Sequence, residues 1–503
     1  MKWIAIVMIF SSVMAMGQTA PSTEPTSRPE HSGTEDKVSV THGSVVIGGA
    51  TIKYEATAGT MLIKDDAGKP LANFFFVAYA KEPKEKAENR PITFVFNGGP
   101  GAAAVWLHLG AAGPERIKLD ADGRPGAPPH GLVANDQSWL DATDLVFIDP
   151  VGTGFSRPVE GQPAQQFYGV QGDLDSISDF IRLYLTRHER WNSPKFLAGE
   201  SYGTTRAAAL SEKLLDGEGI DVNGIILIST VLNFETLEPS AGNELPYALY
   251  LPSYTAIALY HHKLQTADED KLLAEVQDYA LHDYLEALAK GGAIGKDERA
   301  DVVAHLARYT GLSPELIDRA DMRIDSTMFR KHLMDDEREI LGRFDARITG
   351  PDPDPAGDDP EYDPSLSLFL PVYTSTFNDY VRRVLKYESD FKYGVLNPVG
   401  PWDFGKGGLG YLNVSDALRS AMMQNPHLKV LVCSGYEDLA TPFLATKYTV
   451  NHLDLLDRLR GNITQTFYHS GHMIYHDPTS LRELKQNVAA FISGAYQPQA
   501  ETP

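Results

Sequence analysis

Residues 199–203 read Gly-Glu-Ser-Tyr-Gly and place a serine between two flanking glycines. A short apolar run, residues 195–198, precedes this pattern, and an alanine-rich run with helix-forming composition, residues 204–210, follows it. A strand, then Gly-x-Ser-x-Gly, then a helix is the context in which a serine stands on a sharp turn with its hydroxyl exposed at the end of the strand. A chance occurrence of the pattern in a loop would lack these flanks. Ser201 is therefore the predicted nucleophile.

A serine hydroxyl becomes a nucleophile when a histidine accepts its proton and a carboxylate orients that histidine. When the serine lies on such a turn, the acid and then the histidine follow it along the chain. Asp438 comes just after the apolar run 429–432, and His472 follows a glycine in a loop after another probable strand. Ser201, Asp438 and His472 are therefore predicted to form a catalytic triad. Three neighbouring residues are alternatives for the acid and the base: Glu437, His469 and His476.

An acyl-transfer site also needs two N–H donors for the oxyanion that forms when the serine attacks a carbonyl. One donor in this plan is the backbone N–H of the residue after the nucleophile, here Tyr202. The other comes from a glycine-rich loop after an early strand. Residues 97–101, Asn-Gly-Gly-Pro-Gly, follow the apolar run 92–96 and fit that place, with Gly99 as the predicted donor.

Short apolar runs that alternate with helix-compatible segments must position these groups. The runs are residues 92–96, 145–148, 195–198, 225–228 and 429–432. Because continuously apolar strands are buried on both faces, they predict a mostly parallel sheet that is covered by helices. Before them, residues 38–80 contain β-prone runs separated by turns, which predict antiparallel strands. Between residues 233 and 401 helical segments dominate, which predicts a helical cap over the active face.

These features predict an α/β architecture in which an insertion divides the core. The predicted divisions are a signal peptide (1–17), a disordered lead-in (18–36), the first part of the core (37–235), the helical cap (236–400), the second part of the core (401–495) and a tail (496–503). The signal peptide is predicted from one lysine, a short apolar run and small residues at Ala15 and Gly17. We therefore expect export, to the periplasm or the outside of a bacterium.

The composition of the 503 residues excludes some partners. A formal net charge of −22 argues against binding to nucleic acid or an anionic membrane, because both require a positive field. After the leader, no apolar stretch is long enough to span a bilayer. Cys433 is the single cysteine and lies within an apolar run, so burial is predicted and an intramolecular disulfide is excluded. The sequence indicates no oligomeric state.

Four motifs together resemble the serine carboxypeptidase family. Residues 97–101 are similar to its N-G-G-P-G motif, and residues 149–156 to its P-V-G-x-G-F-S segment. Residues 199–203 match the G-E-S-Y elbow, and residues 471–473 match the G-H-M motif. The order and spacing are coherent from about residue 94 to residue 478, and the family also carries a helical insertion. The resemblance implies an α/β-hydrolase fold and release of single residues from peptide C-termini through an acyl-enzyme.

The resemblance assigns the triad and the oxyanion hole to the residues predicted above. It also assigns the substrate's terminal carboxylate to Asn97, the Gly98 backbone and Glu200. A carboxylate held by a glutamate requires one shared proton, because like charges at that distance cannot both remain ionised. The acid-favoured binding of peptides known in the family would then follow from Glu200. The alternative is that Glu200 only favours the N-terminus of the following helix.

The chain departs from the family pattern at three places. Residues 101–104 read Gly-Ala-Ala-Ala where the family has G-C-S-S, and Val95 replaces a tryptophan. Ala111 stands where a second glutamate usually precedes L-G-P. One carboxyl of the usual proton-sharing pair is therefore absent, which bears on the acidic optimum and on the dependence on a free C-terminus.

The leading hypothesis is a serine-type carboxypeptidase that acts on peptides with a free C-terminus. An esterase, an aminopeptidase or an acyltransferase on the same fold is the alternative among enzymes, since a fold does not define a function. An inactive binding protein is the alternative of another class, although all three predicted triad members are present. No clustered His, Cys and carboxylate spacing indicates a metal, and no motif indicates an organic cofactor.

Overall fold

The structure, a computed structural model, describes residues 33–405 and 410–496. Three predicted segments lie outside the described residues. They are the signal peptide, the lead-in except for its last four residues, and the tail beyond residue 496. The first strands form an antiparallel meander: β1 (Val38–Ile47), β2 (Ala50–Lys64) and β3 (Pro70–Glu82). This arrangement is the one that residues 38–80 predict.

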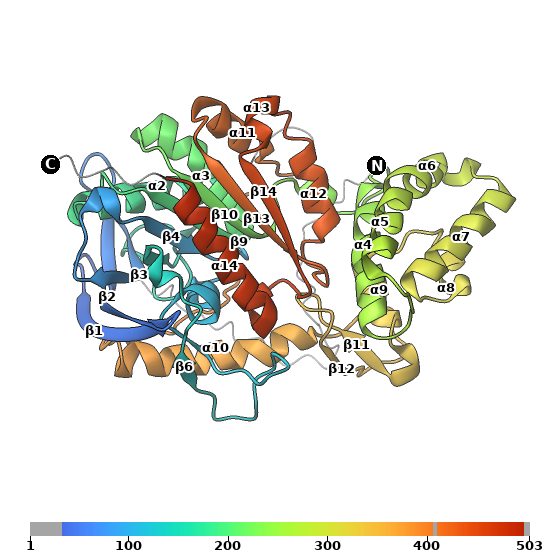
Figure 1. The fold of residues 1–503 in the computed structure, drawn as a ribbon, viewed down its shortest axis with the longest axis horizontal. Helices are drawn as coiled ribbons and strands as arrows, with labels where there is room; N and C mark the ends of the chain where they lie inside the picture. The colour runs from blue at the N-terminus through green and yellow to red at the C-terminus, as the bar shows by residue number, and fades with distance from the viewer. Residues whose placement is uncertain (1–32, 406–409, 497–503) are drawn as a thin grey trace.

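A single large sheet organises the molecule (Figure 1). Its remaining main strands are β4 (Ile92–Phe96), β7 (Asp144–Ile148), β9 (Lys195–Ser201), β10 (Gly224–Thr230), β13 (Lys429–Gly435) and β14 (Ile463–Tyr468). The order is β1-β2-β3-β7-β4-β9-β10-β13-β14, and the short strand β8 (Arg157–Pro158) pairs with β3. All pairings from β7 to β14 are parallel. The predicted mostly parallel sheet is therefore confirmed.

Helices cover both faces of the parallel strands. Neighbouring residues of a strand point to opposite sides of the sheet, so they enter different cores. Phe94 of β4 enters one core with α2 (Val170–Arg187), α3 (Tyr202–Glu218) and α11 (Ser415–Gln424). Val95 enters the other core with α10 (Pro364–Arg383) and α14 (Pro478–Gly494). Cys433 on β13 is fully buried in this second core, as predicted.

A third core lies in the long segment between β10 and β13. Its helices are α4 (Leu245–Tyr260), α5 (Glu269–Tyr279), α6 (Leu285–Lys290), α7 (Lys296–Thr310), α8 (Pro314–Arg319) and α9 (Ser326–His332). They gather at the end of the molecule opposite the antiparallel strands β1 to β3 (Figure 1). Leu439 and the helix α12 (Phe443–Asn451) join this third core, so the helical unit rests on the loop that follows β13.

The segment 236–400 is not uniform. After α9 the chain forms a small hairpin, β11 (Glu339–Leu341) with β12 (Thr349–Pro351), and then returns to the sheet as α10.

Two further small elements precede β7: the helix α1 (Val105–Leu107) and the hairpin of β5 (Glu115–Ile117) with β6 (Leu132–Ala134). Among the described residues, no helix has the length and apolar character that crossing a membrane requires.

Candidate active site

The serine pattern at residues 199–203 forms a tight turn between β9 and α3. Ser201 ends the strand with φ 60° and ψ −130°, and Tyr202 begins the helix. A non-glycine residue in such a conformation costs on the order of 1–3 kcal/mol and persists only where its surroundings impose it. The close approach of the helix to the strand imposes it here, because a Cβ at Gly199 would lie 2.0 Å from the carbonyl oxygen of Gly203. The predicted strand–turn–helix context is confirmed.

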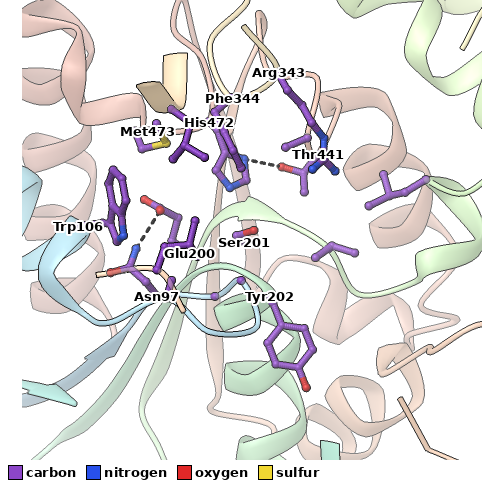
Figure 2. Close-up of a pocket in the computed structure, with 18 of the residues that line it drawn as sticks. Asn97, Trp106, Glu200, Ser201, Tyr202, Arg343, Phe344, Thr441, His472 and Met473 are labelled. Carbon is purple, nitrogen blue, oxygen red and sulfur yellow. Dashed lines mark hydrogen bonds between the residues drawn. The ribbon is translucent and has the colours of Figure 1, made fainter. Parts of the chain in front are cut away.

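Ser201 lies at a pocket that is lined by residues of the core and of the insertion (Figure 2). About 140 Å³ of the pocket is open to water-sized molecules. Glu200 reaches it from the end of β9, and Asn97 and His472 reach it from the loops that follow β4 and β14. The segment between β10 and β13 adds Leu237, Glu238, Arg343, Phe344, Leu366 and Leu396. The pocket is thus mostly apolar, with a few polar groups beside the serine.

The loops after β13 and β14 bring Asp438 and His472 together. The two atoms His472 Nδ1 and Asp438 Oδ2 are 2.7 Å apart, and both side chains are buried. Asp438 Oδ1 accepts the N–H groups of Ala440 at 2.7 Å and of Thr441 at 3.0 Å. The Thr441 hydroxyl donates to Asp438 Oδ2 at 2.6 Å. Both oxygens of the Asp438 carboxylate therefore accept hydrogen bonds, which holds the carboxylate in place and orients the imidazole.

Two contacts hold the backbone of His472 in place. Its N–H donates to the carbonyl of Phe344 at 2.5 Å, and its carbonyl accepts from the Ser229 hydroxyl at 2.6 Å. Burial disfavours the imidazolium, but the charge and hydrogen bond of Asp438, helped by the charge of Glu200, outweigh that effect and raise the pKa of His472. A base with a raised pKa is suited to accept a proton from a serine hydroxyl and to return it later.

The neighbouring alternatives for the acid and the base lie elsewhere. Glu437 is buried but is directed toward His469, whose ring is more than half exposed. His476 stacks on Phe369 with ring centroids 3.6 Å apart and shares a hydrogen bond of 3.0 Å with the Tyr373 hydroxyl. Of these candidates among the described residues, His472 alone lines the pocket, and Asp438 contacts it from behind.

The glycine-rich loop after β4 packs directly on the turn that carries the serine. A Cβ at Gly98 would lie 2.4 Å from the N atom of Tyr202, so a larger residue would push the loop away. Gly99 follows with φ +100°, a backbone conformation that side chains rarely adopt. Tyr202 is the first residue of α3, so its N–H has no acceptor within the helix. Gly98, Gly99 and Tyr202 all line the pocket beside Ser201.

Asn97 and Glu200 form a second polar group at the pocket. The Asn97 amide donates to Glu200 Oε1 at 2.8 Å, and Asn97 Oδ1 accepts the N–H of Leu107 at 3.1 Å. Both side chains are buried, and Figure 2 shows them next to Trp106. Burial raises the pKa of Glu200 to about 7, although nearby donors and the charge of His472 oppose the shift. The Glu200 carboxyl is therefore held at the pocket by Asn97.

A buried ion pair supports the Asn97 loop from behind. Arg206 on α3 donates to the Asp173 carboxylate at 2.7 Å and to the carbonyl of Asn97 at 2.6 Å. Both charged side chains are almost completely buried, so each is the partner that makes burial of the other tolerable. The pair links α2 and α3 to the loop of residues 97–101.

The segment of residues 149–156 has a supporting position rather than a place in the pocket. Asp149 Oδ1 accepts the N–H of Ala104 at 2.8 Å, just beyond the glycine-rich loop. The Ser156 hydroxyl donates to the carbonyl of Asp149 at 2.6 Å and accepts the N–H of Phe75 at 2.8 Å. None of these four residues lines the pocket. This motif therefore ties the glycine-rich loop to β3.

Several residues of the site were not predicted. Thr441 follows Asp438 by three positions, and a hydroxyl at that spacing after an acid is a local signal that could have revealed it. Ser229 and Arg206 act across the fold and have no such signal.

The pocket contains no cluster of metal ligands. Within residues 33–405 and 410–496, one group of side chains is close enough to hold a metal ion: His42, Glu55 and Glu82. These residues lie on the antiparallel strands β2 and β3 and their neighbour β1, are exposed or half-buried, and do not line the pocket.

Comparison with known sequences finds relatives for part of the chain. A model of the serine carboxypeptidase family matches residues 49–286, just under half of the chain. The match includes the glycine-rich loop and Ser201 and ends before Asp438 and His472. The pheromone-processing carboxypeptidase KEX1 of Arthroderma otae is 28% identical over 263 residues, or 51% of this chain and 37% of that protein.

Two other curated relatives give a similar result. Serine carboxypeptidase-like 13 of Arabidopsis thaliana is 26% identical over 178 residues, which cover 35% of this chain and 39% of the relative. A carboxypeptidase Y homolog of Arthroderma benhamiae is 31% identical over 172 residues, which cover 32% and 31%. The matched part of the chain thus spans less than two fifths of each of these relatives. The relatives are plant and fungal, so they do not support the expected bacterial type.

Comparison with solved structures concerns the fold. The crystal structure of a prohormone-processing carboxypeptidase from Saccharomyces cerevisiae aligns with a TM-score of 0.53 at 16% identity and covers 88% of this chain and 91% of that one. Together with the sheet order and the strand–turn–helix at Ser201, this likeness confirms the α/β-hydrolase fold. In sequence, residues 49–286 are similar to the serine carboxypeptidases.

Proposed function

We propose that the protein is a serine-type carboxypeptidase that hydrolyses the last peptide bond of substrates with a free C-terminus. Ser201, His472 and Asp438 would form the triad, and the N–H groups of Gly99 and Tyr202 would form the oxyanion hole. Asn97, Gly98 and Glu200 would bind the terminal carboxylate.

The observation that carries the proposal is the buried pair of Asn97 and Glu200 beside the nucleophile. A serine, a histidine and an acid serve many hydrolases, so they do not define the substrate. A buried amide that donates to a buried carboxyl has no evident purpose for an ester without a charged end. A carboxyl with a pKa of about 7 keeps its proton below that pH, and it can share that proton with a substrate carboxylate.

The reaction would proceed in two halves. In the first, Ser201 Oγ attacks the carbonyl carbon of the last peptide bond while His472 Nε2 accepts the hydroxyl proton. The Gly99 and Tyr202 N–H groups receive the oxyanion, where such donors stabilise charge that develops in the transition state. The tetrahedral intermediate collapses, His472 gives its proton to the leaving amine, and the terminal amino acid departs.

In the second half, water attacks the acyl-enzyme. His472 accepts a proton from the water, and the resulting hydroxide adds to the ester carbonyl of the acylated Ser201. Collapse of this intermediate breaks the bond to Ser201 Oγ, which regains a proton from His472. The shortened peptide leaves with a new carboxylate, and Asp438 keeps the imidazole oriented throughout.

The proposal includes a cap function for the segment 236–400. Arg343, Phe344 and Leu366 line the pocket from this segment, and the Phe344 ring lies beside His472. The Phe344 carbonyl also anchors the His472 backbone. These contacts support a role of the segment in shaping which peptide side chains fit.

The test uses an N-acylated dipeptide with a free C-terminus and its C-terminal amide, each from acid to neutral pH. We expect release of the last amino acid from the free acid, weaker turnover of the amide, and no turnover of either by the S201A variant. Equal or better turnover of the amide, or of a simple ester, would instead favour an esterase, an aminopeptidase or an acyltransferase on this fold. S201A with full biological effect would favour a binding protein.

The expected location and partners complete the proposal. Export rests on the leader pattern of residues 1–17, which lie outside the described residues. A strongly negative net charge supports a peptide rather than a nucleic acid as the partner.

A further inference from the structure

One oxygen of Glu200 is buried without a partner. Oε1 accepts from Asn97, but among the described residues Oε2 has no hydrogen bond. The side chain is 4% exposed. Buried carboxyl oxygens are normally hydrogen bonded, and an unpaired one calls for an explanation.

The Tyr475 hydroxyl is buried and unpaired in the same place. Tyr475 lies three residues after His472, in the turn of residues Ile474–His476, and its side chain is 1% exposed. Its hydroxyl has no formed hydrogen bond within the described part of the chain. The hydroxyl nevertheless lies close enough to Glu200 and Asn97 to affect the pKa of Glu200, and Glu200 in turn raises the pKa of Tyr475.

Small residues on the opposite wall make room for this tyrosine. A Cβ at Gly110 would lie 2.3 Å from the ring of Tyr475 and 2.6 Å from the Tyr373 hydroxyl. Ala111 follows, at the position where the family pattern has its second glutamate, and is fully buried. The pair of small residues and the tyrosine ring therefore fit each other, and Ala111 brings no carboxyl to this place.

We propose that Tyr475 is a positioning residue for Glu200: its hydroxyl donates to Glu200 Oε2 and, with Asn97, holds the carboxyl toward the substrate's terminal carboxylate. The inference rests on the proposed function for its substrate. A phenol takes the place of the absent second acid, and it donates a hydrogen bond without adding a second titrating carboxyl. Proton sharing at this end of the pocket then depends on Glu200 alone.

The direction of the effect follows from which form of Glu200 the hydroxyl favours. A donor stabilises the ionised carboxylate more than the neutral acid, so Tyr475 opposes the rise in the pKa of Glu200 that burial causes. The other groups that act on Glu200 are His472 and Asp438 from the catalytic loops, while Tyr373 on α10 in turn feels the charge of Glu200. Removal of the Tyr475 hydroxyl should therefore raise the pKa of Glu200 further.

The test compares Y475F with Y373F in the full chain. Tyr373 is a matched control, because it is buried in the same wall but its hydroxyl is bonded to His476 at 3.0 Å. For the free-acid dipeptide, kcat/KM should fall with rising pH once Glu200 ionises. In Y475F this fall should move to higher pH by about one unit, the size expected for loss of a hydrogen bond to a charged group. In Y373F it should stay in place.

A second measurement separates this inference from the proposed function. Infrared titration follows the C=O stretch of a neutral carboxylic acid, and the band that disappears in E200Q belongs to Glu200. Its midpoint should rise in Y475F and stay unchanged in Y373F, whether or not peptides are cleaved. An unchanged or lowered midpoint in Y475F, or an equal shift in Y373F, would overturn the role of Tyr475. Failure of the wild type to cleave free-acid peptides would overturn the proposed function alone.

Discussion

The two ends of the pocket differ in how their buried carboxyls are hydrogen bonded. At the catalytic end, Asp438 accepts from two backbone N–H groups, from Thr441 and from His472. At the carboxylate end, Glu200 accepts from Asn97 through one oxygen, and its other oxygen has no formed hydrogen bond to the part of the chain that the structure describes. The first carboxyl is already surrounded by its partners, whereas the second can still accept the Tyr475 hydroxyl and share a proton with a substrate carboxylate.

This difference indicates how one pocket can separate chemistry from recognition. A fully bonded carboxylate keeps its charge and fixes an imidazole, so it serves every substrate that reaches the serine. A partly bonded carboxyl with a pKa raised to about 7 changes its protonation within the working range, so it can discriminate between charged and neutral substrate ends. Variants at the catalytic end should affect all substrates alike, and variants at the carboxylate end should affect free acids.

The largest expected effect is that of S201A. Removal of the nucleophile should lower kcat by about 10⁴-fold or more for the free acid, the amide and an ester alike. Binding of a free-acid peptide should remain, because the carboxylate end is untouched. Steady-state kinetics and calorimetric titration of the peptide check the two parts. Substantial turnover by S201A would show that the catalytic end has been misplaced.

The next largest effect is expected for D438N, with a loss of about 10⁴-fold in kcat. The asparagine side chain cannot hold the imidazole in the required tautomer and charge state. The matched control is E437Q, a change of the adjacent buried carboxyl that faces His469 instead of His472. Its kcat should stay within about threefold of the wild type. Kinetics with both variants, alongside thermal unfolding, decide the assignment; a comparable loss in E437Q would contradict it.

E200Q should change the pH profile rather than the chemistry. Glu200 with a pKa of about 7 is protonated below that pH and can share its proton with a substrate carboxylate; above it, two negative charges oppose each other. In the wild type, kcat/KM for a free acid should therefore fall by about tenfold per pH unit on the alkaline side.

Glutamine cannot ionise, so this alkaline fall should disappear in E200Q. The rise on the acid side, which reports His472, should remain but move to lower pH, because the Glu200 charge no longer helps to raise the pKa of His472. In the wild type, because Asp438 raises the pKa of His472 despite burial, that rise lies at a higher pH than for an unperturbed histidine. The amide serves as the control, because it should show the same shift of the acid-side rise and no alkaline fall in either protein. An alkaline fall that persists in E200Q would remove Glu200 from the carboxylate end.

The catalytic end could be predicted from the sequence because its signals are local. The serine lies in a five-residue pattern with a strand before it and a helix after it, and each partner lies in a loop after an apolar run. Asn97 and Glu200 were predicted from short motifs that resemble those of the serine carboxypeptidase family. In each case the residues that matter are neighbours in the chain, so their spacing carries the information.

The support of both ends could not be predicted, because it depends on contacts across the fold. Ser229 reaches His472 from a strand more than two hundred positions earlier, and the Arg206–Asp173 pair joins two helices to the Asn97 loop. α10 was expected in a cap, yet it packs on the sheet, since apolar periodicity does not say which core a helix joins. The fit of Tyr475 over Gly110 likewise appears only in three dimensions.

The smallest effect we expect is that of T441V, which tests how far the bonding at the catalytic end matters. The variant removes the 2.6 Å hydrogen bond from the Thr441 hydroxyl to Asp438 and keeps the shape of the side chain. Because His472 and two N–H groups still hold the carboxylate, a loss of about 1 kcal/mol, or about fivefold in kcat/KM, is expected for free acid and amide alike. T446V is the control, a buried threonine whose hydroxyl bonds the carbonyl of Thr230. A loss confined to the free acid would contradict the separation of the two ends, since Thr441 would then act on recognition.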